Sequence, residues 1–187
     1  MNAYYPIFLD LSIKKILIIG GGKVALQKIQ LLLKHQAWVQ VVTKNALPQI
    51  QSWAQQKRIQ LSIRPFKQSD LKNKDIVICA THDEKFNQKI GWVCRKKKIL
   101  VNVVDRPLLC DFIVPSIVRK GEVTFAISTG GASPALAQFL RKRLDQLFDA
   151  RLMRIASKLK KMRPELKKFS MQERKKITLK LIQASGL

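Results

Sequence analysis

The chain has 187 residues, of which 47% are hydrophobic, and a formal net charge of +24 at pH 7. Its length allows one good hydrophobic core and a small appendage, and its hydrophobic content excludes an intrinsically disordered protein. The longest aliphatic runs have about four residues, far below the ~20 of a membrane-spanning helix, and the first residues show no signal-peptide pattern, so we expect no membrane association.

The excess of positive charge predicts a polyanionic partner. It is concentrated in the last part of the chain, where from residue 150 onward two acidic residues, Glu165 and Glu173, accompany twelve lysines and arginines. Three explanations stay open: a lysine-rich surface with no specific partner, a small polyanionic substrate, and nucleic acid.

The cysteines and histidines do not form a recognisable metal site. Cys79, Cys94 and Cys110 lack metal-ligand spacing, and a disulfide between two of them would leave the third unpaired. Reduced thiols in a cytoplasmic protein are the simplest interpretation. His35 and His82 are the two histidines, and we expect no protein-bound metal.

The first clear element is an apolar run, Ile16-Leu17-Ile18-Ile19, followed by Gly20-Gly21-Gly22-Lys23-Val24-Ala25. The run predicts a β-strand, the glycines a tight turn, and the segment from Lys23 a helix. Glycines let the backbone approach a ligand closely, and free N–H groups at the start of a helix can bind a pyrophosphate. The spacing matches the dinucleotide-binding fingerprint, with Ala25 at the third small position. A tight strand-to-helix turn without a ligand is the alternative.

Strands then alternate with helices as far as residue 113. Apolar or alternating runs predict further strands at residues 38–42, 59–63, 75–80 and 99–104. Helical spacing predicts helices at residues 24–33, 50–56 and 84–96. This alternation implies crossover connections, so we expect a Rossmann-type, doubly wound parallel sheet of the α/β class.

The pattern changes after residue 111. Two consecutive apolar runs, residues 112–118 and 122–127, surround Lys120-Gly121 and predict a hairpin. A helix is expected next, from Ala135 to about Phe148. Two strands with no helix between them indicate a new, small α+β module.

The remaining chain is basic and helix-prone from Arg151 onward. We expect Pro164 and the Phe169-Ser170 segment to break this helix before a last helix near Gln172. The expected organisation is therefore a Rossmann-type domain with the glycine turn at residues 1–113, a small α+β module at residues 114–149, and a basic helical segment at residues 150–187.

Ligands of an open α/β sheet bind beyond the carboxyl ends of its strands. We expect the loops at those ends to meet at one crevice; they are residues 20–22, 43–45, 81–83 and 105–107. The second strand of an NAD site normally ends in an acid that binds the ribose, but Thr43, Lys44 and Asn45 occupy that place here. Thr43 and Asn45 can hydrogen-bond a ribose, and Lys44 can equally tolerate a 2′-phosphate. The choice between NAD and NADP stays open.

Asp105 is the candidate catalytic residue. It directly follows the apolar run that ends in Val103-Val104, and it precedes Arg106-Pro107, which restrict the turn. A carboxylate in such a position can act as a general base. Alternatively, Asp105 caps the turn or pairs with Arg106.

A second candidate site is the segment Ser128-Thr129-Gly130-Gly131. Its hydroxyl groups and free backbone N–H groups suit an anion. The same segment can be a plain junction between strand and helix, with Ser133 as the N-cap and Pro134 at the first helical position. The two interpretations are compatible.

Several motifs resemble the precorrin-2 dehydrogenase family, the siroheme synthase N-terminal module that in some members also acts as a sirohydrochlorin ferrochelatase. They occur in the family's order over nearly the whole chain. The matching motifs are Tyr5-Pro6-Ile7-Phe8-Leu9, Gly20-Gly21-Gly22-Lys23-Val24-Ala25, Cys79-Ala80-Thr81-His82-Asp83, Asn102-Val103-Val104-Asp105, Asp111-Phe112-Ile113-Val114-Pro115-Ser116 and Ser128-Thr129-Gly130-Gly131-Ala132-Ser133-Pro134-Ala135-Leu136-Ala137.

This resemblance implies NAD-dependent oxidation of precorrin-2 to sirohydrochlorin, with Asp105 as the proposed general base, and a homodimer formed through the central module. Ferrous iron is implied as a substrate only where ferrochelatase activity is present. The basic residues would then attract the carboxylates of the tetrapyrrole. The resemblance places the tetrapyrrole at Ser128, Thr129, Gly130 and Gly131. It places NAD at Gly20, Gly21, Gly22, Lys23, Val24, Thr43, Lys44, Asn45 and Thr81.

Two features depart from the family. His82 stands where many members have an acid or an amide, so its role in the crevice is undefined. The sequence ends at Leu187, without the methyltransferase domain of fused siroheme synthases, so a separate uroporphyrinogen methyltransferase is expected. Two other functions are compatible with the sequence: a nucleotide-sensing regulator with a nucleic-acid-binding tail, and a dehydrogenase acting on another polyanion. The tail lacks interleaved aromatic residues, which disfavours nucleic acid.

Overall fold

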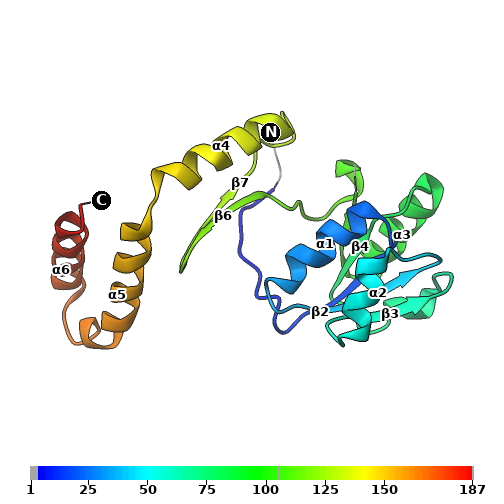
Figure 1. Ribbon diagram of the computed structural model, residues 1–187, viewed down its shortest axis with the longest axis horizontal. Helices are drawn as coiled ribbons and strands as arrows, with labels where there is room; N and C mark the ends of the chain where they lie inside the picture. The colour runs from blue at the N-terminus through cyan, green and yellow to red at the C-terminus, as the bar shows by residue number, and fades with distance from the viewer. Residues whose placement is uncertain (1–3, 105, 187) are drawn as a thin grey trace. The chain divides into compact units, whose positions relative to one another are not determined.

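The computed structural model describes residues 4–104 and 106–186 (Figure 1). The chain divides after Ile113 into two compact units, and each is described by itself. No helix of the described residues has the length and apolar character needed to cross a membrane.

The first unit contains a five-stranded parallel sheet in the order β3-β2-β1-β4-β5 (Figure 1). Its strands are β1 (Lys15–Ile19), β2 (Trp38–Thr43), β3 (Gln60–Ile63), β4 (Ile76–Cys79) and β5 (Leu100–Val103). The chain leaves β1 toward one edge of the sheet and then returns to place β4 on the other side of β1. This reversal creates a topological switch point at the carboxyl end of β1, where such sheets bind ligands.

Helices cover both faces of this sheet. The connecting helices are α1 (Lys23–Leu33), α2 (Pro48–Gln55), the short 3-10 helix η1 (Gln68–Leu71), α3 (Glu84–Lys96) and the short η2 (Pro107–Leu109). Side chains of β1 alternate between the faces: Ile16 and Ile18 pack in the same core as α1 and α2, whereas Leu17 and Ile19 pack with α3. The predicted doubly wound, Rossmann-type sheet is therefore confirmed.

The second unit begins with an antiparallel hairpin and continues as helices (Figure 1). Its elements are β6 (Ser116–Lys120), β7 (Val123–Ile127), α4 (Pro134–Leu147), α5 (Ala150–Leu166) and α6 (Met171–Ala184). The Lys120 ammonium lies 2.9 Å from the Asp145 carboxylate of α4, and the Lys160 ammonium of α5 lies 2.8 Å from that of Glu122. The second contact joins the helical segment from residue 150 to residues 114–149, and the two segments form one compact unit.

Two predicted boundaries are wrong for identifiable reasons. The first hairpin strand begins at Ser116 rather than at residue 112, because Pro115 has no N–H for a ladder and the Phe112 carbonyl accepts from the Asn102 amide at 2.9 Å. The helix α5 continues through Pro164 to Leu166. Proline removes the backbone hydrogen bond to the carbonyl of residue 160 and crowds that carbonyl, and the helix ends two residues after Pro164.

Candidate functional site

A cleft of about 700 Å³ lies at the carboxyl ends of β1, β2 and β4. This volume is in the range of a small-molecule or cofactor site. Seven of the predicted cofactor residues line it together: Gly20, Gly21, Gly22, Thr43, Lys44, Asn45 and Thr81. Lys23 and Val24 are not in the lining and form the first turn of α1. Asp105, the predicted catalytic residue, lies outside the described residues.

The glycine turn packs too tightly for two of its members to carry side chains. A Cβ on Gly20 would lie 2.3 Å from the Ala80 carbonyl oxygen, and Gly20 has a φ of +124°. A Cβ on Gly21 would lie 2.2 Å from the Asn45 carbonyl oxygen. At Gly22 a Cβ would meet nothing within 4 Å, so this glycine presents bare backbone to the cleft.

The N-terminus of α1 supplies groups that suit an anion. Gly22 is the N-cap residue, no side chain caps this end, and the first turn carries no acidic residue. Helix N-termini with unsatisfied N–H groups are natural phosphate-binding sites. Together with the bare backbone at Gly22, this end fits the pyrophosphate of a dinucleotide.

The loop after β2 is fixed against the glycine turn. The Thr43 hydroxyl donates to the Asn45 carbonyl at 2.7 Å, and the Leu47 N–H donates to the Gly21 carbonyl at 3.0 Å. Thr43 still has hydroxyl lone pairs, and Lys44 and Asn45 are exposed at the cleft. These groups are available to a ligand in the cleft, and the ribose contact of Thr43 and Asn45 stays a prediction.

Arg64 is a cleft residue that the sequence analysis missed. Its guanidinium donates two hydrogen bonds to Asp70 of η1, from Nη1 to Oδ2 at 2.9 Å and from Nη2 to Oδ1 at 2.6 Å. The Arg64 hydrogen bond is the main cause that keeps the pKa of Asp70 below its ordinary value, and a backbone hydrogen bond from Lys67 adds to it. Arg64 follows β3 as Lys44 follows β2, and that alignment of strand ends is the pattern that points to it.

The loop after β4 is anchored by Asn87, which the sequence analysis also missed. The Thr81 hydroxyl donates to Asn87 Oδ1 at 2.6 Å, and Asn87 Nδ2 donates to the Thr81 carbonyl at 3.0 Å. Asn87 is buried although it is polar. Its helical spacing from Ile90 and Cys94 places it on the buried face of α3, and this spacing was the available indication. His82 and Asp83 also line the cleft, and Asp83 caps α3 by accepting from the Phe86 N–H at 3.0 Å.

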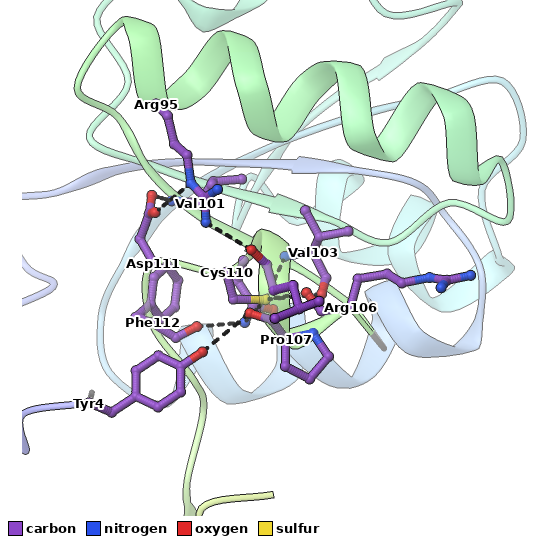
Figure 2. Close-up of polar contacts among 11 residues, drawn as sticks. Tyr4, Arg95, Val101, Val103, Arg106, Pro107, Cys110, Asp111 and Phe112 are labelled. Atoms are coloured by element: carbon purple, nitrogen blue, oxygen red, sulfur yellow. Dashed lines mark hydrogen bonds and ion pairs between the residues drawn. The ribbon is translucent and has the colours of Figure 1, made fainter. Parts of the chain in front are cut away.

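The loop after β5 is held by a dense set of hydrogen bonds, which Figure 2 shows. Asp111 accepts from Arg95 Nε and from the Val101 N–H, both at 3.0 Å. The Cys110 thiol donates to the Val103 carbonyl at 3.1 Å, and the Tyr4 hydroxyl donates to the Pro107 carbonyl at 3.3 Å. The described residues on both sides of position 105 are therefore tied to the sheet and to α3.

Arg106, next in the sequence to the predicted catalytic residue, has an acidic partner of its own. Its guanidinium forms an ion pair with Glu84, the first residue of α3.

The three cysteines are free. Burial raises the pKa of the Cys79 thiol to about 12 and that of Cys94 to about 11. Both thiols are neutral at physiological pH, and the thiolate is the form that attacks substrates or binds metals. Neither buried thiol therefore provides a nucleophile for the cleft.

Comparison with known proteins identifies the family to which the chain belongs. A family model described as putative NAD(P)-binding matches residues 7–116, and one described as the central part of sirohaem biosynthesis proteins matches residues 122–147. A solved structure titled "SirC, precorrin-2 dehydrogenase" has a TM-score of 0.79 and 25% sequence identity, and the match covers 96% of this chain and 89% of that one. The chain belongs to the precorrin-2 dehydrogenase family.

Curated relatives of this family member are siroheme synthases. That of Nitrosomonas eutropha is 39% identical over 175 residues, which are 92% of this chain and 37% of the relative. That of Nitrosococcus oceani is 41% identical over 144 residues, which are 77% of this chain and 31% of the relative. The chain thus spans about a third of the length of the curated relatives that it matches.

The predicted tetrapyrrole residues of this precorrin-2 dehydrogenase family member, Ser128 to Gly131, lie in the second unit between β7 and α4. Ser133 caps α4 by accepting from the Leu136 N–H at 3.2 Å, and Pro134 is its first residue, so the predicted strand-to-helix junction is confirmed. The Gly130 N–H donates to the Ser128 hydroxyl at 3.2 Å. A Cβ on Gly131 would meet nothing within 4 Å, although its φ of +87° favours glycine.

Proposed function

We propose that the chain oxidises precorrin-2 to sirohydrochlorin in siroheme biosynthesis, with NAD as the hydride acceptor. The observation that carries this proposal is the likeness to SirC, which extends over 96% of the chain and so includes both units. The glycine-lined cleft supports it, because its turn and helix N-terminus fit a dinucleotide pyrophosphate.

Each part of the cleft has a defined task in this proposal. The turn at Gly22 and the N-terminus of α1 bind the pyrophosphate, and Thr43 and Asn45 hydrogen-bond the ribose. The Thr81 loop, fixed by the buried Asn87, forms the opposite wall. Orientation of the reactants by a rigid site of this kind contributes a large share of catalysis.

The oxidation removes a hydride and a proton from precorrin-2. When bound, NAD supplies the hydride acceptor. We assign the proton to the carboxylate of Asp105, on its place in the sequence after β5. A carboxylate is a suitable general base for this proton. The described residues that follow it, Cys110 and Asp111, are hydrogen-bonded to β5.

The substrate is a polycarboxylate, and the second unit offers groups that can bind it. We propose that the backbone and hydroxyl groups of Ser128, Thr129, Gly130 and Gly131 hydrogen-bond the tetrapyrrole. The basic surface of α5 and α6 raises its local concentration. We also propose that two copies form a homodimer through this unit.

The cellular setting follows the same proposal. Precorrin-2 is expected from a uroporphyrinogen methyltransferase, and the reaction is expected in the cytoplasm. The free thiols of Cys79, Cys94 and Cys110 support this location, because the cytoplasm keeps thiols reduced.

The test is oxidation of precorrin-2 under anaerobic conditions, first with NAD and then with NADP, followed by the absorbance of sirohydrochlorin. We expect turnover only when a nucleotide is present. Asp105→Asn is expected to lower kcat by about 10²–10⁴-fold. The matched control is Asp10→Asn, because Asp10 bonds Ser12 and does not line the cleft, and it should keep full activity.

Two outcomes would count against the proposal. Full activity of folded Asp105→Asn would remove its assigned role. Failure of the wild-type protein to oxidise precorrin-2 with either nucleotide would overturn the function, and salt-sensitive binding to DNA of any sequence would then favour a regulator.

Ferrous iron is a substrate only if the chain also has ferrochelatase activity. Within the described residues no group of three His, Cys, Asp or Glu side chains could hold a metal ion. Chelation does not require such a group, since the tetrapyrrole nitrogens are the final ligands. A second stage of the assay adds ferrous iron: loss of the sirohydrochlorin spectrum faster than without enzyme would indicate chelation.

A further inference from the structure

One side of α3 carries an exposed tryptophan in a row of lysines. This outer row consists of Lys85, Lys89, Trp92 and Lys96. Its members are separated by four, three and four residues, so they lie on one line along the helix. All of them are exposed, and 61% of Trp92 is in contact with solvent. The opposite side of α3 packs on the sheet, where Ile90 belongs to the core.

The outer row carries a positive charge that no acid balances. Its lysines, and the two that follow the helix, form none of the ion pairs among residues 4–104 and 106–186; they are Lys85, Lys89, Lys96, Lys97 and Lys98. The acidic residues next to α3 have partners of their own: Asp83 caps the helix, and Glu84 and Asp111 pair with Arg106 and Arg95. The five lysines are therefore available to an anionic partner.

Trp92 lies among these charges rather than in a core. The Lys96 ammonium is 3.8 Å from the centroid of the Trp92 ring, which is a cation–π contact. An indole ring suits the boundary between an apolar phase and water, because its body is apolar and its N–H is polar. Lysines at such a boundary keep their apolar stems along it and their ammonium groups in the water. A tryptophan among clustered lysines is typical of a helix that lies on an anionic membrane surface.

Single-stranded nucleic acid fits the outer row less well. Proteins that bind it stack successive bases on several aromatic side chains. Trp92 is the aromatic member of the row, and the Lys96 ammonium already lies over its ring. A lipid surface requires no stacking and offers phosphates to all of the lysines at once.

We propose that the outer row of α3 docks on the surface of an anionic lipid bilayer, with Trp92 at the level of the headgroups and the five lysines at the lipid phosphates. The residues of the row are not among those that line the cleft, so this contact leaves the cleft residues unused. The role goes beyond the proposed oxidation and does not depend on it. The expectation of no membrane association concerned apolar runs that could span a bilayer, and a surface contact requires none.

The experiment measures binding of the full chain to vesicles of phosphatidylcholine, with or without phosphatidylglycerol. Co-sedimentation gives the affinity, and tryptophan fluorescence reports the surroundings of Trp92. We expect binding to the vesicles that contain phosphatidylglycerol, with a blue shift of the emission as Trp92 leaves water. The same measurement on Trp92→Phe isolates the contribution of Trp92 from those of Trp38 and Trp53, and this variant should show no shift.

Two lysine pairs test the residue assignment. Lys85→Ala combined with Lys89→Ala should lower the affinity for the anionic vesicles about 25-fold, or about fivefold for each lysine. Lys175→Ala combined with Lys176→Ala is the matched control, because it removes the same charge from exposed lysines of α6. This control pair should leave the affinity close to that of the wild type.

The proposal is overturned if the anionic vesicles do not bind, if they bind without a shift of the Trp92 emission, or if both lysine pairs weaken binding alike. The last two results would mean that a basic chain is attracted to any negative surface. Quenching of Trp92 by single-stranded oligothymidylate, with no shift on vesicles, would overturn it in favour of nucleic acid.

Discussion

The three glycines of the turn between β1 and α1 are glycines for different reasons. A side chain on Gly20 or Gly21 would collide with the backbone of a neighbouring loop. At Gly22 the space is open, and its φ of −86° suits any residue. The fold does not require glycine at position 22, so a requirement there must come from a ligand that approaches the backbone.

This difference gives a prediction at the residue scale. We expect Gly22→Ala to keep the free energy of unfolding within about 0.5 kcal/mol of the wild type but to weaken NAD binding by about tenfold. Gly21→Ala should lower both the stability and the affinity for NAD, because the new methyl group overpacks the turn. The expected loss of stability is about 1–3 kcal/mol. Urea denaturation and calorimetric titration measure the two effects. Unchanged NAD affinity in Gly22→Ala would mean that the pyrophosphate does not lie on this turn.

At the scale of elements, the Arg64–Asp70 pair joins the end of β3 to η1. The pKa of Asp70 is lower in the folded protein than its ordinary value of 3.8. Its ionised form therefore stabilises the folded state above pH 3.8, and this contribution is lost as the pH falls through the lower pKa of the folded state.

The expected consequence is a pH-dependent stability difference. Asp70→Asn should be about 1–3 kcal/mol less stable than the wild type at pH 7, and the difference should shrink as the pH falls below 3.8. Urea denaturation at a series of pH values measures it. Ser69→Ala, an exposed neighbour in η1 that does not titrate, should show a difference that is constant with pH. A constant difference for Asp70→Asn as well would show that its charge is not what stabilises this contact.

The elements of the first unit were predictable because its central strands are buried on both faces. Such strands appear as nearly continuous apolar runs, and β1 and β4 are buried almost throughout. The glycine turn and the loop after β2 were also predictable, since their place depends on the order of elements alone. The errors arose where tertiary contacts decide: Asn102 of β5 binds the Phe112 carbonyl and prevents an early hairpin strand.

The site residues that sequence patterns missed depend on contacts across loops, between residues six positions apart. Arg64 becomes a cleft residue because Asp70, six positions later, orients its guanidinium. Asn87 lies on the buried face of α3, where it satisfies the Thr81 loop. Neither contact can be predicted from the spacing of residues in the sequence alone, because each one depends on the path that a loop takes. The role of Asp105 stays a prediction, since no described contact tests it.

At the scale of the whole molecule, the two units differ in how much apolar surface they bury. Among the described residues of the second unit, Val118 and Ile155 are the buried apolar side chains. Large apolar residues of α4 remain exposed at helical spacing: Leu136, Phe139, Leu140 and Leu147. An apolar stripe on an exposed helix indicates a surface that another protein covers.

The proposed homodimer explains this apolar stripe, and it predicts the molecular mass of the protein in solution. Sedimentation equilibrium should give about twice the 21.4 kDa of one chain. Phe139→Glu places a charge on the stripe, where Phe139 is 54% exposed, and should shift the protein to monomers because burying that charge is costly. Trp92→Glu is the matched control: Trp92 is a similarly exposed aromatic residue of α3, 61% exposed in the first unit, and its replacement should leave the dimer intact.

If the wild-type protein is a monomer, or if both variants dissociate alike, the stripe of α4 is not the dimer surface. The exposed apolar side chains would then require a different partner.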